Sequence, residues 1–502
     1  MILRAFFILE NDFTHLIHLN DQKASTSGDY ERRFNMNFSK PKGTYDVLPK
    51  ESARWQNVES LIREICSIFN YKEIRTPMFE STQLYHRSAG ETSDVVSKET
   101  YDFKDRGDRS MTLRPEGTAG VVRSYIENKL YADQMVQKMF YIGPMFRYER
   151  QQKGRYRQHV QFGTEVFGSA DPAIDAEVIS LAVTLYQVLG LRNIKVKLNS
   201  LGDTQSRENY RAALLSHFEG HKEELCSDCQ VRLEKNPLRV LDCKVDRHKE
   251  IMQNAPQMID HLTDEDKAYF MSVQKYLKAM GIEYEYDATL VRGFDYYTHT
   301  IFEIQADIEG FGAQNTLCGG GRYNKLVSEL GGPTVPAIGF GMGLERLLLA
   351  LEAEGIQVAG EDSVDFFLIT LGEDAKVFGS RLLFDLRSRG LACETDYLGK
   401  NLKGQFKQAD RYNARYTAIL GDEELQHGMI NIKNNQTGTQ ESIPVGFIID
   451  YIIQDQQRNH QHGGGCCGGH GHDEDHGCCG GHGHDEDHEC CGGNGHGCGC
   501  QH

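Results

Sequence analysis

One region of the sequence brings together four strongly polar side chains of types that bind ligands. Because side chains alternate between the faces of a strand, Arg147 and Glu149 should share one face, and Gln161 and Glu165 should share another. If these faces coincide, one side of a β-hairpin carries a cation, two carboxylates and an amide. The hairpin is predicted from two strand-like segments, 138–149 and 159–168, around a polar turn at 150–157.

Two interpretations of this hairpin stay open. Its polar face could be a solvated surface of ion pairs, which contribute little to stability. Alternatively it binds a ligand, because strong polar groups on a covered face are costly unless they are paired. The turn supplies further cations that suit a phosphate chain or the end of a nucleic acid: Arg150, Lys153, Arg155 and Arg157.

A second motif is "LRPEGTA" at 113–119. Glu116 and Thr118 flank Gly117, and a glycine there would let a small ligand approach the backbone closely. The alternative is an ordinary turn in which the glutamate caps a helix.

A third motif, "LVRGFDYYTHTIFE" at 290–303, places Arg292 in a predicted apolar strand near Tyr296 and Tyr297. A cation in such a strand predicts an ion pair, for which Asp295 is the nearest partner. The functional alternative is an anchor for an anion.

The fourth motif, "GFGMGLER" at 339–346, does not have the glycine spacing of a dinucleotide-binding loop. It predicts a strand that runs into a helix, with Arg346 in the first helical turn. The helix dipole disfavours a cation at this end, so an anion such as a phosphate is expected in front of it.

The cysteines fall into two groups. Eight of the 14 follow residue 465, and the scatter of the other six favours a reducing compartment over a disulfide scaffold. Cys226, Cys229, Cys243 and His248 have a spacing that zinc ligands can adopt. The alternative is a set of free thiols in a helical segment.

Residues 459–502 repeat "CCGGHGHDED" and contain nothing that could form a core. Thiolates and imidazoles bind zinc, nickel or copper, and flexible glycines predict several exchangeable sites. The alternative is a disordered tail without a selected role. The expected ligands are Cys466, Cys467, His470, His472, Cys478, Cys479, His482 and His484.

Segments with helix and strand patterns surround these motifs. Helices are expected at 52–69 and 175–189, and strands at 71–75, 194–198 and 285–305. Residues 204–283 are charged and helix-like, which indicates an inserted domain. From residue 365 strands and helices alternate, which predicts a small α/β domain with a largely parallel sheet.

Together these motifs carry a resemblance to a known family. "YKEIRTPMFE", "MFRYERQQKGRYRQ" and "GFGMGLERLLLAL" resemble, in order, the three signature motifs of class II aminoacyl-tRNA synthetases. "LVRGFDYYTHTIFE" and "LCGGGRYNKL" resemble the two signatures peculiar to the histidyl-tRNA synthetases, and further segments are similar to the bacterial type. The resemblance extends from about residue 40 to about residue 453.

The resemblance implies an ATP-dependent ligase that joins L-histidine to tRNA(His) through a histidyl-adenylate, with Mg²⁺ bridging the phosphates. Arg147 and Arg292 would be catalytic, and ATP would be bound by Arg147, Glu149, Arg155 and Arg346. Histidine would contact Glu116, Gly117, Thr118, Arg147, Gln161, Glu165, Arg292, Tyr296 and Tyr297. His159 stands where the family has an aromatic residue that stacks on adenine.

The implied fold is an α+β catalytic domain on an antiparallel sheet, with a helical insertion, a C-terminal α/β anticodon-binding domain and a disordered tail. On the predicted helix at 400–412, Lys403, Lys407 and Arg411 would contact tRNA, while Leu402, Phe406 and Ala409 would face the core. The expected segments are 1–35 (extension), 36–203 and 284–356 (catalytic domain), 204–283 (insertion), 363–455 (anticodon-binding domain) and 459–502 (tail).

The resemblance further implies a cytoplasmic homodimer. The alternative is a related protein that lacks synthetase activity and serves as a regulatory subunit in histidine biosynthesis. The intact histidine signatures and C-terminal domain argue against this alternative.

Length and charge narrow the choice of function. A chain of 502 residues predicts about three domains, and it has no run of about 18–20 apolar residues that could span a membrane. The net charge of −17 argues against a general binder of polyanions and leaves room for a local basic site.

Overall fold

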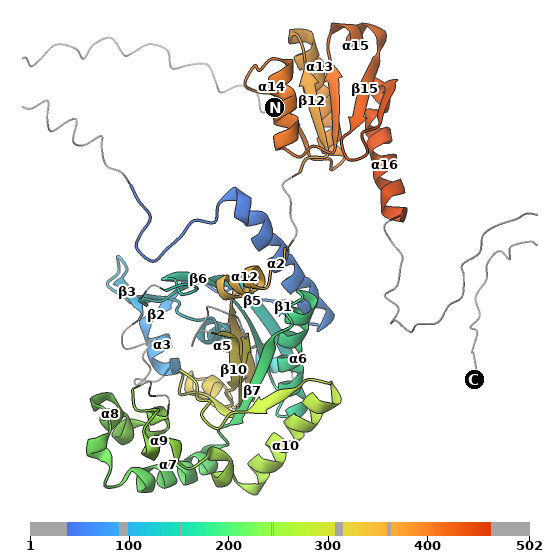
Figure 1. Cartoon of the computed structure of the whole chain (residues 1–502). Coiled ribbons are helices and arrows are strands. Elements are labelled where there is room, and N and C mark those ends of the chain that lie inside the picture. The colour runs from blue at the N-terminus through green and yellow to red at the C-terminus, as the bar shows by residue number, and fades with distance from the viewer. Residues whose placement is uncertain are drawn as a thin grey trace, which may run out of the picture. The chain divides into compact units, whose positions relative to one another are not determined.

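The computed structural model describes residues 38–89, 99–133, 135–150, 152–241, 243, 245–306, 315–358 and 363–462. The chain divides into two compact units, Met1–Glu361 and Asp362–His502 (Figure 1). None of the helices in the described ranges is long and apolar enough to cross a membrane. The predicted extension at 1–35 and the eight expected metal ligands of the tail lie outside the described residues.

The first unit is built on an eight-stranded sheet. Its six inner strands pair antiparallel, and only the two edge strands pair parallel. The predicted antiparallel catalytic sheet is therefore confirmed. The order is β1 (Lys72–Glu73), β5 (Gln137–Phe146), β6 (Gln158–Phe167), β11 (Ala337–Gly343), β10 (Thr316–Arg322), β9 (Thr298–Ala306), β7 (Ile194–Ser200) and β8 (Tyr284–Tyr286).

The predicted hairpin is formed by β5 and β6. In its register Gly143 faces Gln161, and Met139 faces Glu165. Strand β5 ends at Phe146, so Arg147 and Glu149 follow the strand instead of lying within it.

Each face of this sheet packs into its own hydrophobic core. One core joins alternate strand residues such as Phe140 and Phe162 to the helices α2 (Pro49–Ile68), α6 (Pro172–Val188) and α12 (Leu344–Ala353). The other core joins Met139 and Tyr141 to α5 (Thr118–Glu127) and to the helical segment after β7. A three-stranded sheet stands beside them, in the order β2 (Phe79–Ser81), β4 (Ser110–Leu113) and β3 (Tyr101–Lys104), with α3 (Thr82–Ala89).

The residues between β7 and β8 are mostly helical and gather at one end of the first unit, the lower end in Figure 1. They contain α7 (Thr204–Phe218), α8 (Ser227–Lys235), α9 (Glu250–Gln253) and α10 (Asp264–Ala279), with short 3-10 turns at Lys222–Glu224, Pro237–Val240 and Met258–His261. This is the segment in which the sequence indicates an insertion.

The second unit is an α/β domain, as predicted. Its strands are ordered β13 (Cys393–Thr395), β12 (Phe366–Thr370), β14 (Tyr416–Leu420), β15 (Met429–Asn434) and β16 (Gln440–Pro444). The first three strands are parallel to one another. Strand β15 runs antiparallel to β14 and forms an antiparallel hairpin with β16 at the edge of the sheet. The helices are α13 (Glu373–Ser388), α14 (Leu402–Arg411), α15 (Asp422–His427) and α16 (Ile448–His462).

The inward face of α14 differs from the prediction. Leu402 and Phe406 are 39% and 38% exposed, so of the three expected core residues only Ala409 is buried. Gln405 is buried instead, because its amide both accepts from and donates to the backbone of Thr370 at the end of β12, each at 3.0 Å. A polar side chain is favoured there since it satisfies backbone groups that end the strand pairing.

Candidate active site

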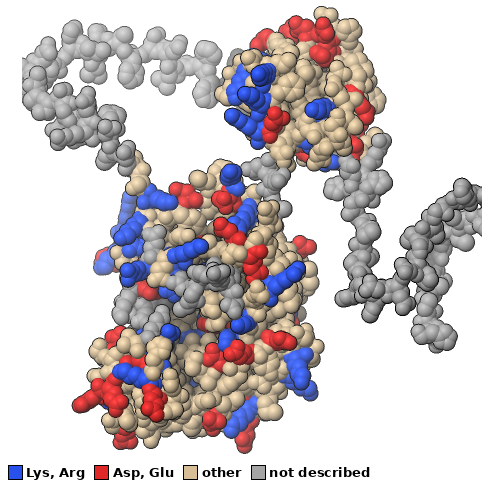
Figure 2. Space-filling model, viewed as in Figure 1, with Lys and Arg blue, Asp and Glu red and all other residues tan. Residues whose placement is uncertain are grey.

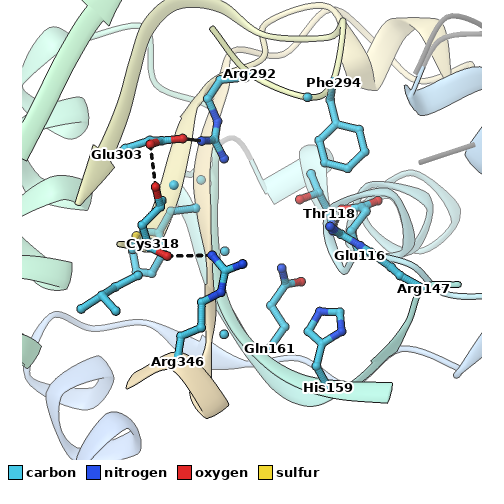
Figure 3. A pocket seen from close by; sticks show the side chains of 18 of the residues that line it. Glu116, Thr118, Arg147, His159, Gln161, Arg292, Phe294, Glu303, Cys318 and Arg346 are labelled. Atoms are coloured by element: carbon cyan, nitrogen blue, oxygen red, sulfur yellow. Dashed lines mark hydrogen bonds and ion pairs between the residues drawn. The ribbon is translucent and has the colours of Figure 1, made fainter. Parts of the chain in front are cut away.

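A cavity of about 400 Å³ opens on the sheet of the first unit (Figure 3). Segments far apart in the sequence line it: the end of β5, the turn before β6, the start of α5, the loop before β9, and strands β10 and β11. Ten of the predicted site residues belong to its wall: Glu116, Thr118, Arg147, Glu149, Arg155, Gln161, Arg292, Tyr296, Tyr297 and Arg346. Gly117 and Glu165 lie behind that wall.

Four arginines share this cavity, and protein groups hold them in place. Arg147 donates to the carbonyl of Pro115 at 2.7 Å, which ties the hairpin to the turn before α5. Glu149 lies between two of them, 3.7 Å from Arg147 and 3.5 Å from Arg155.

Arg346 stands in the first turn of α12, as predicted. It donates to the carbonyls of Thr316 at 2.9 Å and Gly154 at 3.4 Å. Burial, and then repulsion from Arg155, lowers the pKa of its guanidinium. Desolvated cations in such proximity favour an anion in the cavity, because an anion relieves their mutual repulsion.

The prediction for Arg292 was wrong in two respects. Arg292 lies in the loop between β8 and β9, not in a strand, and its partner is Glu303 on β9 instead of Asp295. Asp295 points toward the insertion, where it accepts from Asn236 at 3.0 Å and lies 3.5 Å from Arg239. Figure 3 shows Arg292 and Arg346 reaching toward the same space from different elements.

The turn before α5 combines the two interpretations of its motif. The Glu116 carboxylate caps the helix, because it accepts from the backbone N–H groups of Thr118 at 2.6 Å and Ala119 at 2.9 Å. It also forms part of the cavity wall. A Cβ atom at Gly117 would lie 2.2 Å from the ring of Tyr141, so this position has no room for a side chain.

Glu165 is a carboxyl group buried directly behind the wall, with 1% of its surface exposed. It accepts a hydrogen bond from Thr118 at 2.6 Å and another from Tyr323. Burial raises its pKa from 4.5 to about 8, against the opposing effect of these two hydrogen bonds. At neutral pH the carboxyl group is therefore largely protonated while the cavity holds no cation.

Glycines in β10 and β11 create the space for these polar side chains. A Cβ atom at Gly319 would lie 2.4 Å from the guanidinium of Arg292, and one at Gly339 would lie 2.1 Å from the carboxylate of Glu165. A Cβ atom at Gly341 would lie 2.5 Å from the amide of Gln161. The glycine strands, defined as Gly319–Gly320 of β10 and Gly339 and Gly341 of β11, thus leave room that any larger residue would fill.

The sequence prediction omitted several residues of the site. Glu303 and Tyr323 lie within the motifs that the sequence singled out, but the partner of each became apparent only from the register of β9 and β10. Glu345 accepts from Tyr45 and, at 2.8 Å, from the backbone N–H of Val160, so it joins three distant segments. His159, by contrast, is a residue that the sequence had singled out. It lines the cavity, and burial together with Arg147 and Arg346 lowers its pKa to about 3, which keeps the ring neutral.

Comparisons with known proteins agree with this geometry. A family model described as "Histidyl-tRNA synthetase" matches residues 43–347, and one described as "Anticodon binding domain" matches residues 365–455. The chain is 56% identical to the histidine–tRNA ligase of Bacillus cytotoxicus over 84% of this chain and 99% of that protein. It is 55% identical to that of Lysinibacillus sphaericus over 84% of this chain and 100% of that protein.

Among solved structures, apo S. aureus histidyl-tRNA synthetase matches with a TM-score of 0.73 and 45% identity, over 83% of this chain and 99% of that chain. Histidyl-tRNA synthetase from Nostoc sp. PCC 7120 has a TM-score of 0.60 at 18% identity, over 84% of this chain and 100% of that chain, which shows a common fold alone.

The raised pKa of Glu165 predicts a specific pH dependence of stability. The native state retains a proton that the unfolded state has lost between pH 4.5 and about 8, so stability should fall as the pH rises through this window. The slope is at most about 1.4 kcal/mol per pH unit. Glu165→Gln mimics the protonated group and should show a flatter profile of thermal unfolding midpoint against pH. Glu285→Gln, at an exposed carboxyl group, is the control; identical profiles for Glu165→Gln and the wild type would contradict the assignment.

Proposed function

The chain belongs to the histidyl-tRNA synthetase family and is a histidine–tRNA ligase, and we propose that the residues of its cavity activate histidine with ATP. The observation that carries the proposal is the convergence of four arginines and a buried carboxyl group on one cavity. The anticodon-binding domain and the identity over nearly the full length of two ligases set aside the regulatory-subunit alternative.

The first step joins two anions. A carboxylate oxygen of histidine attacks the α-phosphorus of ATP, the bond from that phosphorus to the bridging oxygen breaks, and pyrophosphate leaves. We assign contact with the α-phosphate and the carboxylate to Arg147 and Arg292, and contact with the γ-phosphate to Arg155 and Arg346. These cations are fixed by the protein before ATP arrives, so they stabilise the developing charge without being reorganised.

The second step transfers the histidyl group. A hydroxyl of the 3′-terminal adenosine of tRNA(His) attacks the carbonyl carbon of the adenylate, and AMP leaves. No general base is assigned to this step; the proposal attributes the rate enhancement to positioning and electrostatics.

Recognition of the adenine is assigned to Glu149 and His159. Glu149 would accept from the adenine amino group. The neutral ring of His159 can stack on the base without adding a further charge to a cationic cavity.

Recognition of histidine is assigned to the wall between α5 and the loop before β9. Gln161, Tyr296 and Tyr297 line it, and Glu116 and Thr118 form its edge. The ammonium group of histidine is cationic, and a nearby cation would favour the ionised form of Glu165. The resulting carboxylate, which accepts a hydrogen bond from Thr118, would place a negative charge near the ammonium group.

Magnesium ions bound to the phosphates would supply further positive charge. Glu303 fits as their protein ligand, because it is a carboxylate in the wall and magnesium takes one or two such ligands while keeping several waters. Glu345 is the other carboxylate of this part of the wall. Both already accept hydrogen bonds from protein groups, Glu303 from Arg292, Gln305 and Thr316, and Glu345 from Tyr45 and Val160.

Recognition of tRNA(His) is proposed for the exposed face of α14. Lys403, Lys407 and Arg411 are exposed along this helix, and Asn401 caps its start. Figure 2 shows basic side chains gathered on the side of the second unit where Figure 1 draws α14. Phe406 is 38% exposed, which adds an aromatic surface suited to stacking on an unpaired base.

A homodimer is proposed through the first class II motif, which contains α2 and β1. This segment and the residues directly after it expose three large apolar side chains: Ile68 at 74%, Met78 at 51% and Phe79 at 51%. Strand β1 is also an edge of the sheet, so its open side is available to another chain.

The remaining proposals rest on the family and the sequence. They are a cytoplasmic location, uptake of zinc, nickel or copper by the tail, and the following domains: 36–203 with 284–356 (catalytic), 204–283 (insertion) and 363–455 (anticodon-binding).

Replacing Arg292 tests the assigned chemistry. Arg292→Ala should lower histidine-dependent ATP–pyrophosphate exchange by a factor on the order of 10²–10³, since one fixed donor to the transition state is lost. Lys153→Ala removes an exposed cation of the nearby turn that is not part of the wall, and it should leave the exchange rate unchanged. A near-normal exchange rate in Arg292→Ala would show that the site is assigned wrongly.

Reversing charge on α14 tests whether this helix binds tRNA while the cavity of the first unit activates histidine. The double substitution Lys403→Glu with Lys407→Glu should raise the KM for tRNA(His) by about tenfold or more at low salt, because phosphate contacts become repulsive. Pyrophosphate exchange, which needs no tRNA, should be unchanged. Lys376→Glu, at an exposed position of α13, is the matched control. An equal loss in both assays would refute the proposed surface.

The dimer interface can be tested by placing a charge in it. Ile68→Glu should shift sedimentation of the protein from dimer to monomer, because burying an unpaired carboxylate in an apolar interface is costly. Met271→Glu on α10, where the side chain is 66% exposed, should stay dimeric. A wild-type chain that sediments as a monomer at every concentration and is fully active would overturn the proposal.

A further inference from the structure

A compact group of metal-binding side chains lies in the helical segment, apart from the cavity. The thiols of Cys226, Cys229 and Cys243 and a carboxylate oxygen of Asp246 all lie within 4.8 Å of one another. Cys229, Cys243 and Asp246 are buried, and Cys226 is partly buried. We call these four residues the Cys₃Asp cluster.

The spacing of the sulfur atoms matches a tetrahedral metal site. The Sγ atoms of Cys226 and Cys243 are 3.7 Å apart. A Zn–S bond of about 2.3 Å implies about 3.8 Å between two sulfurs at the corners of a tetrahedron. A disulfide would require about 2.05 Å, so the two sulfurs are far from bonding distance.

The local fold holds all four groups together. Cys226 precedes α8 and Cys229 lies in its first turn, which gives the two-residue spacing typical of zinc ligands. Cys243 follows the 3-10 turn at Pro237–Val240. The backbone N–H of Cys226 donates to Asp246 at 2.8 Å, and that of Asp246 donates to the sulfur of Cys243 at 3.3 Å.

The fourth member differs from the one that the sequence spacing favoured. His248 is exposed, and its ring accepts from Arg247 at 3.1 Å. Asp246 is fully buried and takes that place because the turn after Cys243 points its carboxylate inward. Lys249 lies 2.8 Å from the other carboxylate oxygen, so a cation already offsets part of the negative charge.

We propose that the Cys₃Asp cluster binds one structural zinc ion. Three thiolates and a carboxylate complete a four-coordinate shell without an open position, as in structural and not catalytic zinc sites. Three thiolates, one carboxylate and Zn²⁺ leave a net charge of −2, and Lys249 and the two backbone donors partly neutralise it.

A metal ion would join short elements of this part of the chain to one another. Between α7 and α10 the helices are short: nine residues in α8 and four in α9. The thiols of Cys229 and Cys243 stand in the hydrophobic core of this segment.

Metal analysis of a chain that ends at Arg458 tests the proposal without interference from the tail. This chain keeps every residue that the two family models match and loses only the last four residues of α16. After expression with zinc, reduction and brief treatment with EDTA, it should retain about one equivalent of zinc. Cys229→Ser and Cys243→Ser should each lose most of it, whereas Cys393→Ser, at a buried thiol elsewhere, should retain it. The full chain should take up additional, more easily removed zinc.

A second measurement covers the case in which the serine variants do not fold. Cobalt(II) in place of zinc should give the strong near-ultraviolet absorption of thiolate-to-cobalt charge transfer in the chain ending at Arg458. Asp246→Cys should fold, retain one metal ion and strengthen this absorption by about one third, from three thiolates to four. The proposal is overturned if this chain holds no stoichiometric zinc after reconstitution, or if Cys229→Ser binds as much as the wild type. A disulfide with no metal in the reduced and reconstituted protein would overturn it as well.

Discussion

Four guanidinium groups facing one cavity impose the constraint on which the catalytic unit depends. Each must stay fixed while its neighbours repel it. Three are held by a group from another segment, Arg147 by the carbonyl of Pro115, Arg292 by Glu303 and Arg346 by the carbonyl of Thr316, and Arg155 is held by Glu149 of the same hairpin turn. The antiparallel sheet brings these segments together, and the helices behind it supply the apolar burial that keeps the sheet in place. The same contacts therefore stabilise the fold and hold the guanidinium groups in place for anionic substrates.

Much of this arrangement could be predicted from local sequence. Hydrophobic periodicity and turn residues, which are local features, predict the hairpin and the helix after "GFGMG". They also predict the alternation of strands and helices in the second unit. Partners across strands could not be predicted this way. Arg292 pairs with Glu303 because β9 turns that residue toward the cavity, whereas the nearer Asp295 points to the insertion. Likewise, α14 buries Gln405 because a strand end needs hydrogen bonds, which no apolar periodicity reveals.

The helical segment between β7 and β8 also positions part of the cavity wall. Arg239 donates to the carbonyl of Gly293 at 2.6 Å, and Arg207 donates to that of Tyr297 at 3.1 Å. With the contact of Asn236 to Asp295, these hydrogen bonds support the middle and the end of the loop that carries Arg292, Tyr296 and Tyr297. The Cys₃Asp cluster stands close by in sequence, at the start of α8 and after the 3-10 turn that contains Arg239. Order in this segment and the position of the loop that carries Arg292 therefore share a structural basis.

The glycine strands limit how this site can change by mutation. Any side chain added at Gly319, Gly339 or Gly341 would collide with Arg292, Glu165 or Gln161, which are the groups assigned to the substrates. An inhibitor that fills the space above these strands therefore meets a surface where any single substitution adds a side chain that would also displace Arg292, Glu165 or Gln161. The absence of side chains thus makes this part of the cavity a durable target.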